Sequence, residues 1–170
     1  MDIVQARTDI INWITGFVEK PHPALNGWAP CPFARRARLE ERFDIQEGQV
    51  NPVIDMQNAS MNNNDVVAWV YSPLQFTADQ FNSMTDTLNT QYLQSRGLYA
   101  LCDHPDDVET VNGVVMNQGD WAIVFLQDLD KLNQHAEMLA EKGYYQDWPE
   151  QYLKQLFHGR KDPRHDMAIR

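Results

Sequence analysis

The sequence predicts an α+β fold, because three short apolar runs alternate along the chain with two helices that carry clear end signals. The runs lie at 65–71, 98–102 and 121–126, and their length and composition are typical of strands. A helical pattern follows the first run and the third. The order strand, helix, strand, strand, helix predicts a ferredoxin-like antiparallel sheet with helices on one face. Extra N- and C-terminal helices are expected around this unit, within a single domain over 1–170.

The first third of the chain is predicted to hold two helices and a weak strand. Apolar residues at helical spacing favour a helix over 2–19, and Pro21 stops it. Four prolines between 21 and 32 indicate a loop. Pro32 suits the first position of a second helix, with Cys31 as its N-cap. Weak alternation over 43–57 then predicts an edge strand that Pro52 interrupts.

End signals define the two later helices. Thr77 with Gln80 three residues on is a capping box, and Gly97 is expected to end that helix in a left-handed conformation. Asp128 is expected to cap the next helix, which Gly143 ends. The remaining segments are a long polar loop with an Asn-Gly pair, a short helix and a polar tail, at 103–120, 147–157 and 160–170.

Composition excludes several classes of protein. The 170 residues carry 14 Lys and Arg against 24 Asp and Glu, a net charge of −10. Such a chain is repelled by nucleic acid and by anionic lipid. No apolar run approaches the ~20 residues that span a bilayer, and the N-terminus lacks the pattern of a secretory signal. We therefore expect a cytoplasmic protein that binds neither membranes nor nucleic acid, with Cys31 and Cys102 as reduced thiols.

Cys31 is the strongest single candidate for chemistry. A thiol at the start of a helix lies near unpaired backbone N–H groups, and Arg35 follows one turn later. Both features favour the thiolate and are expected to lower its pKa. Arg35 and Arg38 could hold an anionic substrate by bidentate hydrogen bonds. The alternatives are an inert, buried cysteine and a solvated arginine face.

The second candidate region is Leu-Cys-Asp-His-Pro-Asp-Asp at 101–107, where a predicted strand ends. His104 could act as a general base, with Asp103 and Asp106 orienting its ring. A transition metal such as iron or zinc would need three convergent ligands, which Cys31, Asp103, His104 and Asp106 could supply if the two segments meet. The alternative is an ordinary solvated strand end.

Two resemblances bear on these positions. Cys-Pro-Phe-Ala-Arg-Arg-Ala-Arg-Leu at 31–39 is similar to a stretch of omega-class glutathione transferases. We interpret this match as local convergence, because the strand that their fold needs before the cysteine is absent here. More broadly the chain resembles a bacterial family, domain of unknown function 1415. The shared features are Trp13 in the first helix, the loop from Asn26 into 31–35, and His-Pro-Asp at 104–106. The family's Asn-Arg-Ser-Pro-Tyr-Pro stretch is missing, and the family implies no activity.

Two functional hypotheses follow. In the first, Cys31, Arg35 and His104 line one thiol- or metal-centred site that acts on a small anionic molecule. Cys31 would be nucleophile or ligand, and His104 base or ligand. In the second, the chain is a non-catalytic, acidic interaction or regulatory protein in which Cys31 is structural. The sequence does not decide whether the chain is an enzyme.

Overall fold

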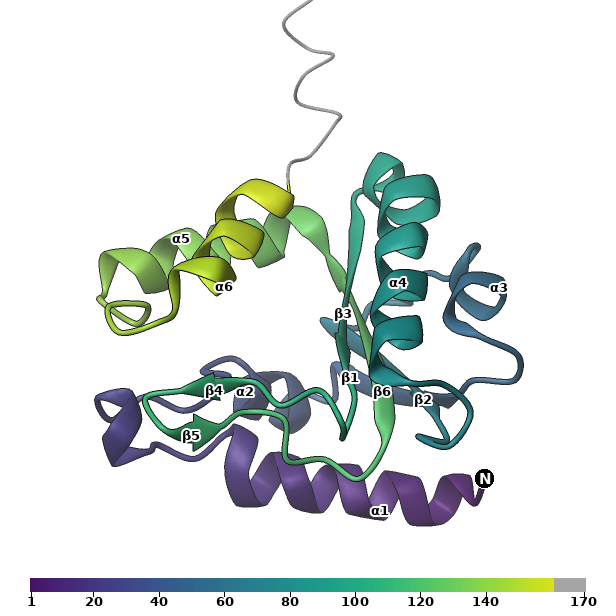
Figure 1. Cartoon of the computed structure of the whole chain (residues 1–170), viewed down its shortest axis with the longest axis horizontal. Helices are drawn as coiled ribbons and strands as arrows, with labels where there is room; N and C mark the ends of the chain where they lie inside the picture. The colour runs from purple at the N-terminus through teal and green to yellow at the C-terminus, as the bar shows by residue number, and fades with distance from the viewer. Residues whose placement is uncertain (161–170) are drawn as a thin grey trace, which may run out of the picture.

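The computed structural model describes residues 1–160, and a four-stranded sheet forms its centre (Figure 1). The strand order is β1-β2-β6-β3, and a separate two-stranded hairpin contains β4 and β5. The strands are β1 Phe43–Glu47, β2 Val66–Tyr71, β3 Leu98–Asp103, β4 Thr110–Val111, β5 Val114–Val115 and β6 Ala122–Asp128. The three predicted strands are therefore β2, β3 and β6. They pair antiparallel, so the predicted α+β class and the pairing of these strands are confirmed.

One edge of the sheet corrects the all-antiparallel prediction, because β1 runs parallel to β2. Parallel neighbours need a crossover connection, and here the short helix α3, Pro52–Met56, lies in that connection. Pro52 does not interrupt a strand as predicted. It occupies the first turn of α3, where its missing N–H costs nothing, and the side chain of Asn51 caps the helix.

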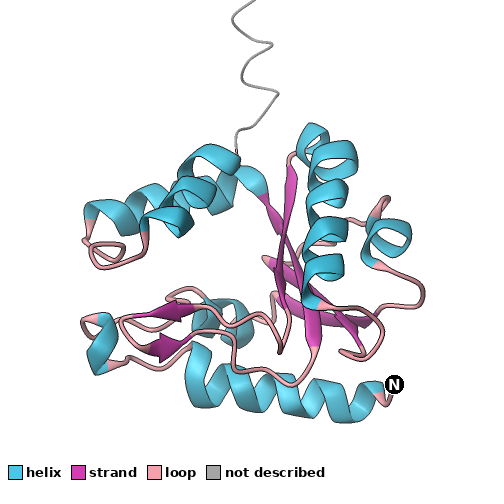
Figure 2. Ribbon diagram, viewed as in Figure 1, coloured by secondary structure: helices cyan, strands magenta, loops and turns pink. Residues whose placement is uncertain are grey.

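Helices cover both faces of the sheet, whereas helices on one face were predicted (Figure 2). The helix α4, Ala78–Leu88, packs with α3 on one face through Phe81, Leu88 and Met56. The first helix, α1 Ile3–Trp13, covers the other face through Ala6 and Ile10. Successive side chains of β6 point to opposite faces of the sheet: residues 122, 124 and 126 face α4, and residue 123 faces α1.

Most predicted helix ends are confirmed. Thr77 and Gln80 form both bonds of the capping box, and the Asp128 side chain accepts the Lys131 N–H. Gly97 and Gly143 have φ of 72° and 78°, the left-handed values that favour glycine. The other helical elements are η1 Ile14–Val18, η2 Pro23–Leu25, α2 Ala34–Leu39, η3 Asn89–Leu93, η4 Gln94–Arg96, α5 Leu129–Glu141, α6 Glu150–Lys154 and η5 Gln155–Gly159. Among the described residues no helix is both long and apolar enough to cross a bilayer.

Two sets of side-chain hydrogen bonds stabilise the sheet, one just after β1 and one on the edge strand β3. After β1, the Asp55 carboxylate accepts the N–H groups of Gln49 and Val50 and the hydroxyl of Tyr71 at 3.0–3.2 Å. At the opposite edge, the buried Asn89 amide bonds both backbone groups of Ala100 in β3, at 2.7 and 2.9 Å.

The helices α5 and α6 extend away from the sheet, to the left in Figure 1, instead of covering its face. The β4–β5 hairpin and η2 lie below them on the same side of the molecule (Figure 1). The hairpin turns at Asn112-Gly113, both of which have positive φ, within the predicted polar loop. A third, smaller apolar cluster joins these segments: Leu25, Val111 and Val114, with Phe17, Trp28, Met116, Trp148 and Tyr152 against them.

Candidate functional site

His104, the predicted base, is a core residue. It is 1 % exposed, its ring lies 5.9 Å from the Phe81 ring, and both ring nitrogens are bonded. Nε2 lies 3.0 Å from the Phe76 carbonyl oxygen, and Nδ1 accepts the Asp106 N–H at 3.2 Å. A carbonyl only accepts and a backbone N–H only donates, so Nε2 carries a hydrogen and Nδ1 acts as the acceptor. In this arrangement neither nitrogen is free to take a proton from a substrate.

The other residues of this strand end point in different directions. Cys102 faces the α4 layer and donates to Asn82 Oδ1 at 3.0 Å, while burial raises its pKa to about 12. Asp103 lies on the opposite face of β3. Burial, together with the nearby carboxylates of Glu109 and Asp107, raises the pKa of Asp103 to about 7. Asp106 is exposed.

Cys31 lies in a turn and not at a helix N-cap. The helix α2 begins two residues later than predicted, at Ala34, with Phe33 as its N-cap. The reason is local: the Cys31 N–H donates to the Val18 carbonyl, and its own carbonyl accepts the Ala34 N–H in a tight turn. Although Cys31 is exposed at the surface, protein atoms surround it on the other sides, and this desolvation raises its pKa. The shift is opposite to that of an activated thiolate.

The arginines near Cys31 face a carboxylate of the chain itself. Arg38 makes a bidentate pair with Glu19, with Nε–Oε2 3.0 Å and Nη2–Oε1 2.7 Å. The hydrogen bond from Arg38 lowers the pKa of Glu19, and the charge of Arg35 adds to that effect. Arg36 pairs with Glu40 at 2.9 Å. Arg35 is exposed on α2, so of the two predicted substrate-binding arginines it is Arg38 whose guanidinium is occupied by Glu19.

The two halves of the predicted site make no direct contact in the described part of the chain. Within residues 1–160, neither a hydrogen bond nor a ring contact links Cys31 to His104. Nor do three His, Cys, Asp or Glu side chains of that part of the chain come together as metal ligands. The Cys31 thiol instead lies near Tyr144 and Tyr145, whose pKa values it influences. Tyr144 fixes this loop, because its hydroxyl donates to the Pro30 carbonyl at 2.5 Å.

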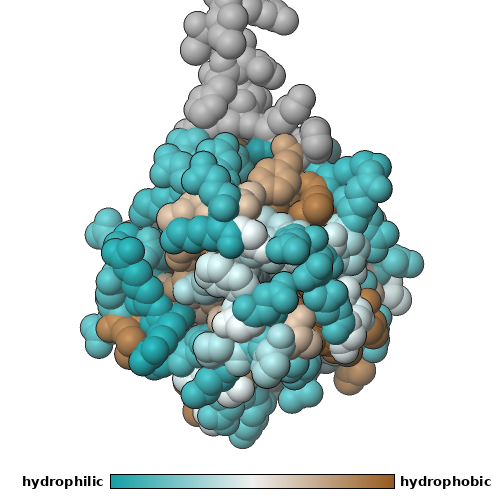
Figure 3. Space-filling model, turned by 90° about the vertical axis from the view of Figure 1, so that its left-hand side faces the viewer, coloured by the Kyte–Doolittle hydropathy of each residue, from teal (hydrophilic) through white to brown (hydrophobic). Residues whose placement is uncertain are grey.

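These tyrosines belong to an aromatic cluster that the sequence analysis missed. Tyr145 is its centre, with ring centroids 4.8 Å from Tyr144, 5.3 Å from Trp148 and 5.7 Å from Phe157, all close to edge-on. The cluster consists of Trp28, Tyr144, Tyr145, Trp148, Tyr152 and Phe157. Figure 3 looks onto this side of the molecule, where residues of intermediate hydropathy lie between hydrophilic ones. The density of aromatic residues over 144–157 is the signal that could have revealed it.

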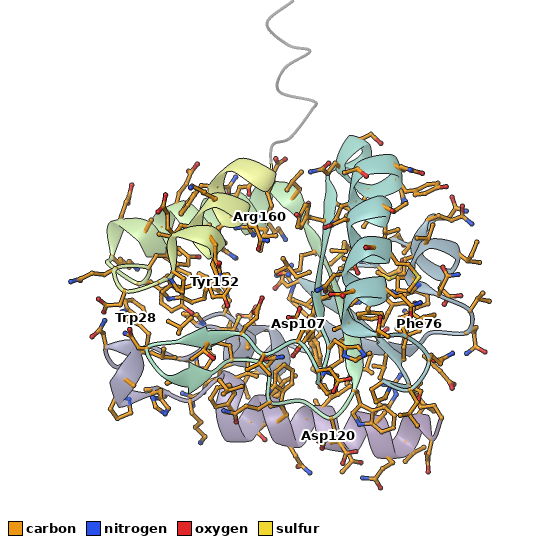
Figure 4. All side chains as sticks on the ribbon, in the orientation of Figure 1. Trp28, Phe76, Asp107, Asp120, Tyr152 and Arg160 are labelled. Carbon is orange, nitrogen blue, oxygen red and sulfur yellow. The ribbon has the colours of Figure 1, made fainter. Side chains whose placement is uncertain are left out.

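Arg160 lies beside this cluster at the end of η5, on the side that faces β3 (Figure 4). It is 4 % exposed, and burial lowers its pKa. Its Nε donates to the Leu156 carbonyl at 2.9 Å, but its buried Nη2 has no hydrogen-bond partner in the described chain. The backbone is anchored, because Asn133 donates to the Arg160 carbonyl at 3.2 Å. The guanidinium is thus a buried charge with an unused donor.

Two tyrosine hydroxyls accompany this guanidinium. Arg160 interacts electrostatically with Tyr99 on β3 and with Tyr145. Burial raises the pKa of both phenols, that of Tyr145 to about 12, so both keep their protons at neutral pH. Among residues 1–160 neither hydroxyl is hydrogen-bonded. We call Tyr99, Tyr145 and Arg160 the Arg160 site: a buried guanidinium whose Nη2 has no partner in the described residues, with two phenols near enough to interact with its charge.

Comparison of the chain with protein-family models, with curated proteins and with solved structures finds no match. The resemblance to domain of unknown function 1415 therefore stays a prediction.

Proposed function

We propose that this protein binds a small organic monoanion, a carboxylate, at the Arg160 site. The observation that carries the proposal is the buried guanidinium without an acceptor for Nη2 in the described chain. Burying an unpaired charge costs several kcal/mol, roughly, even after the protein relaxes, so an anion that reaches it gains a strong, charge-assisted hydrogen bond. The proposal keeps the anionic ligand that the sequence suggested and moves its counter-charge from Arg35 and Arg38 to Arg160.

The donor set favours a single negative charge. One guanidinium balances one carboxylate, and the Tyr99 and Tyr145 hydroxyls add neutral donors. Asp103 lies on the same strand and the same face as Tyr99, with Asp107 and Glu109 near it. These carboxylates, on a chain of net charge −10, would repel the second charge of a phosphate group.

Access to the site requires a small local opening. The Nη2 atom has almost no accessible surface. The segment that leads to Arg160, α6 and η5, is held to other segments by few hydrogen bonds besides that of Asn133 to the Arg160 carbonyl. Asn26 donates to Asp147 at 2.7 Å, just before α6, and Gln94 donates to the Gly159 carbonyl at 3.4 Å. Elements with few such contacts open at low free-energy cost.

Melting temperatures in sodium acetate and in sodium chloride, at equal ionic strength, test the proposal. Ligand at ten times its Kd stabilises a protein by about 1.4 kcal/mol, which raises Tm by roughly 3–6 °C for a chain of this size. Arg160→Met keeps most of the apolar contact and removes the charge, so it should abolish the increase. Arg35→Met, an exposed arginine removed in the same way, is the control and should retain it.

Two further results bear on the buried charge. Without acetate, Arg160→Met should be more stable than the wild type by about 1–4 kcal/mol, because an uncompensated buried charge is lost. Asp162 and Asp166 follow in the sequence, outside the described residues. If acetate stabilises only the Asp162→Asn/Asp166→Asn variant, the chain supplies its own anion and the proposal fails. It also fails if acetate has no effect, or acts equally on Arg160→Met.

A further inference from the structure

We infer that the carboxylate is attached to an aromatic ring, which packs against the exposed Phe157 ring beside Tyr145. This inference rests on the proposed function and adds the chemical class of the ligand. Its basis is the most exposed member of the aromatic cluster. Phe157 is 41 % exposed, while its ring meets the Tyr145 ring edge-on at 5.7 Å and 86°.

Phe157 and the Arg160 site share Tyr145. The Tyr145 ring contacts Phe157, and its hydroxyl belongs to the Arg160 site. Arg160 follows Phe157 by three residues in the same helical segment, and its Nε bonds the carbonyl of Leu156, the residue before Phe157. A molecule whose anionic end meets the guanidinium therefore has its body beside the Phe157 ring.

The part of β3 next to Tyr99 of the Arg160 site is apolar as well. Leu101 is 40 % exposed and lies on the same face of β3 as Tyr99, one pleat period further along. The exposed leucine and the exposed phenylalanine thus each adjoin one tyrosine of the Arg160 site: Leu101 follows Tyr99 along β3, and Phe157 contacts Tyr145. A wholly polar anion would leave both side chains in water, whereas an apolar body would cover them.

The geometry of the cluster favours an aromatic body over an aliphatic one. Tyr145 already makes edge-to-face contacts with three rings, the arrangement that the aromatic quadrupole favours. Such contacts contribute roughly 2- to 10-fold in affinity beyond the area they bury. A ring that joins Phe157 and Tyr145 continues the same pattern.

Equilibrium titrations with benzoate, cyclohexanecarboxylate and acetate separate the affinity that comes from aromatic contact from that of an apolar body and of the carboxylate alone. The first two have similar size, so a preference for benzoate reports aromatic contact. We expect benzoate to bind roughly 2- to 10-fold more tightly than cyclohexanecarboxylate, and acetate to bind most weakly. Phe157→Leu keeps an apolar side chain and should erase the preference for benzoate while acetate binding stays unchanged. Phe157→Ala should weaken benzoate and cyclohexanecarboxylate alike.

An NMR measurement on the wild type does not depend on the variants folding. Bound benzoate should show nuclear Overhauser effects from its ring protons to the Tyr145 and Phe157 rings. If acetate binds but benzoate is no tighter than cyclohexanecarboxylate, or these effects are absent, the aromatic class is wrong and the proposed function stands. If none of the three carboxylates binds, the proposed function itself is wrong.

Discussion

Replacing Gly48 by alanine should destabilise the protein strongly, because the added methyl group would occupy space that Tyr71 fills. A Cβ built at Gly48 lies 2.0 Å from Tyr71 Cε1 and 2.2 Å from Cζ. The Tyr71 side chain is 0 % exposed and belongs to the core beneath α4. Gly48 is held in place as well, since its N–H donates to the Val70 carbonyl at 2.9 Å.

The cost can be estimated from two parts. Forcing extra volume into a close-packed core costs about 1–3 kcal/mol. Moving the ring also breaks the bond from the Tyr71 hydroxyl to Asp55, at 3.1 Å, and a hydrogen bond to a charged group contributes about 1.5–3 kcal/mol. We therefore expect a loss of about 3–5 kcal/mol, which lowers Tm by roughly 6–20 °C for a chain of this size.

Differential scanning calorimetry of Gly48→Ala and Gly16→Ala provides a matched comparison. Gly16 lies in η1 with nothing within 4 Å of its built Cβ, so alanine there should stabilise by about 0.4–1 kcal/mol. In a Tyr71→Ala background the cost of alanine at position 48 should largely disappear. A Tm for Gly48→Ala within about 1 °C of the wild type would refute the packing described for Tyr71.

Three further predictions concern titratable groups. The pKa of Asp103 is about 7 in the folded chain and near 4 in an unfolded one. Between these pH values the folded state binds more protons than the unfolded state, so the free energy of unfolding falls as the pH rises from 4 to 7. Urea denaturation should show Asp103→Asn about 1–3 kcal/mol more stable than the wild type at pH 8 and little changed at pH 4; equal pH profiles would contradict this. His104→Ala should cost about 2–4 kcal/mol in the same assay, because it leaves a cavity and unpaired groups in the core, and an unchanged midpoint would show that the ring is dispensable. Iodoacetamide at pH 7 should alkylate both Cys31 and Cys102 more slowly than free cysteine, because desolvation raises both pKa values; mass spectrometry would reveal a faster, activated thiol.

Much of the fold could be predicted because its signals are local. The three strands are short apolar runs, and the capping box at Thr77 and the glycine at 97 are readable from neighbouring residues. The parallel edge could not be predicted in the same way. The connection between β1 and β2 is polar and holds only the short helix α3, so no periodic pattern shows that the chain crosses over the sheet.

The candidate site was harder to predict because its residues are far apart in the sequence. The residues of the Arg160 site come from β3, from the turn after α5 and from the end of η5, so only the fold brings them together. The sequence pointed instead to His104, whose polar ring serves the core by bonding a loop carbonyl and a backbone N–H. The sequence pointed to Cys31 as well. The predicted helix start was two residues too early, and the expected lowering of the thiol pKa depended on Cys31 lying at that start.

The amide of Asn89 has a consequence for how this protein behaves at high concentration. A strand at the edge of a sheet offers unpaired N–H and C=O groups to any other extended chain, and so can seed assembly into larger β-structures. By bonding both backbone groups of Ala100, Asn89 occupies the contacts in the middle of β3 that an incoming strand would need. The π-helical turn η3, which begins at Asn89, places this amide over the strand. The side chain thus acts as a built-in barrier to self-association, and it blocks the edge without adding a charge.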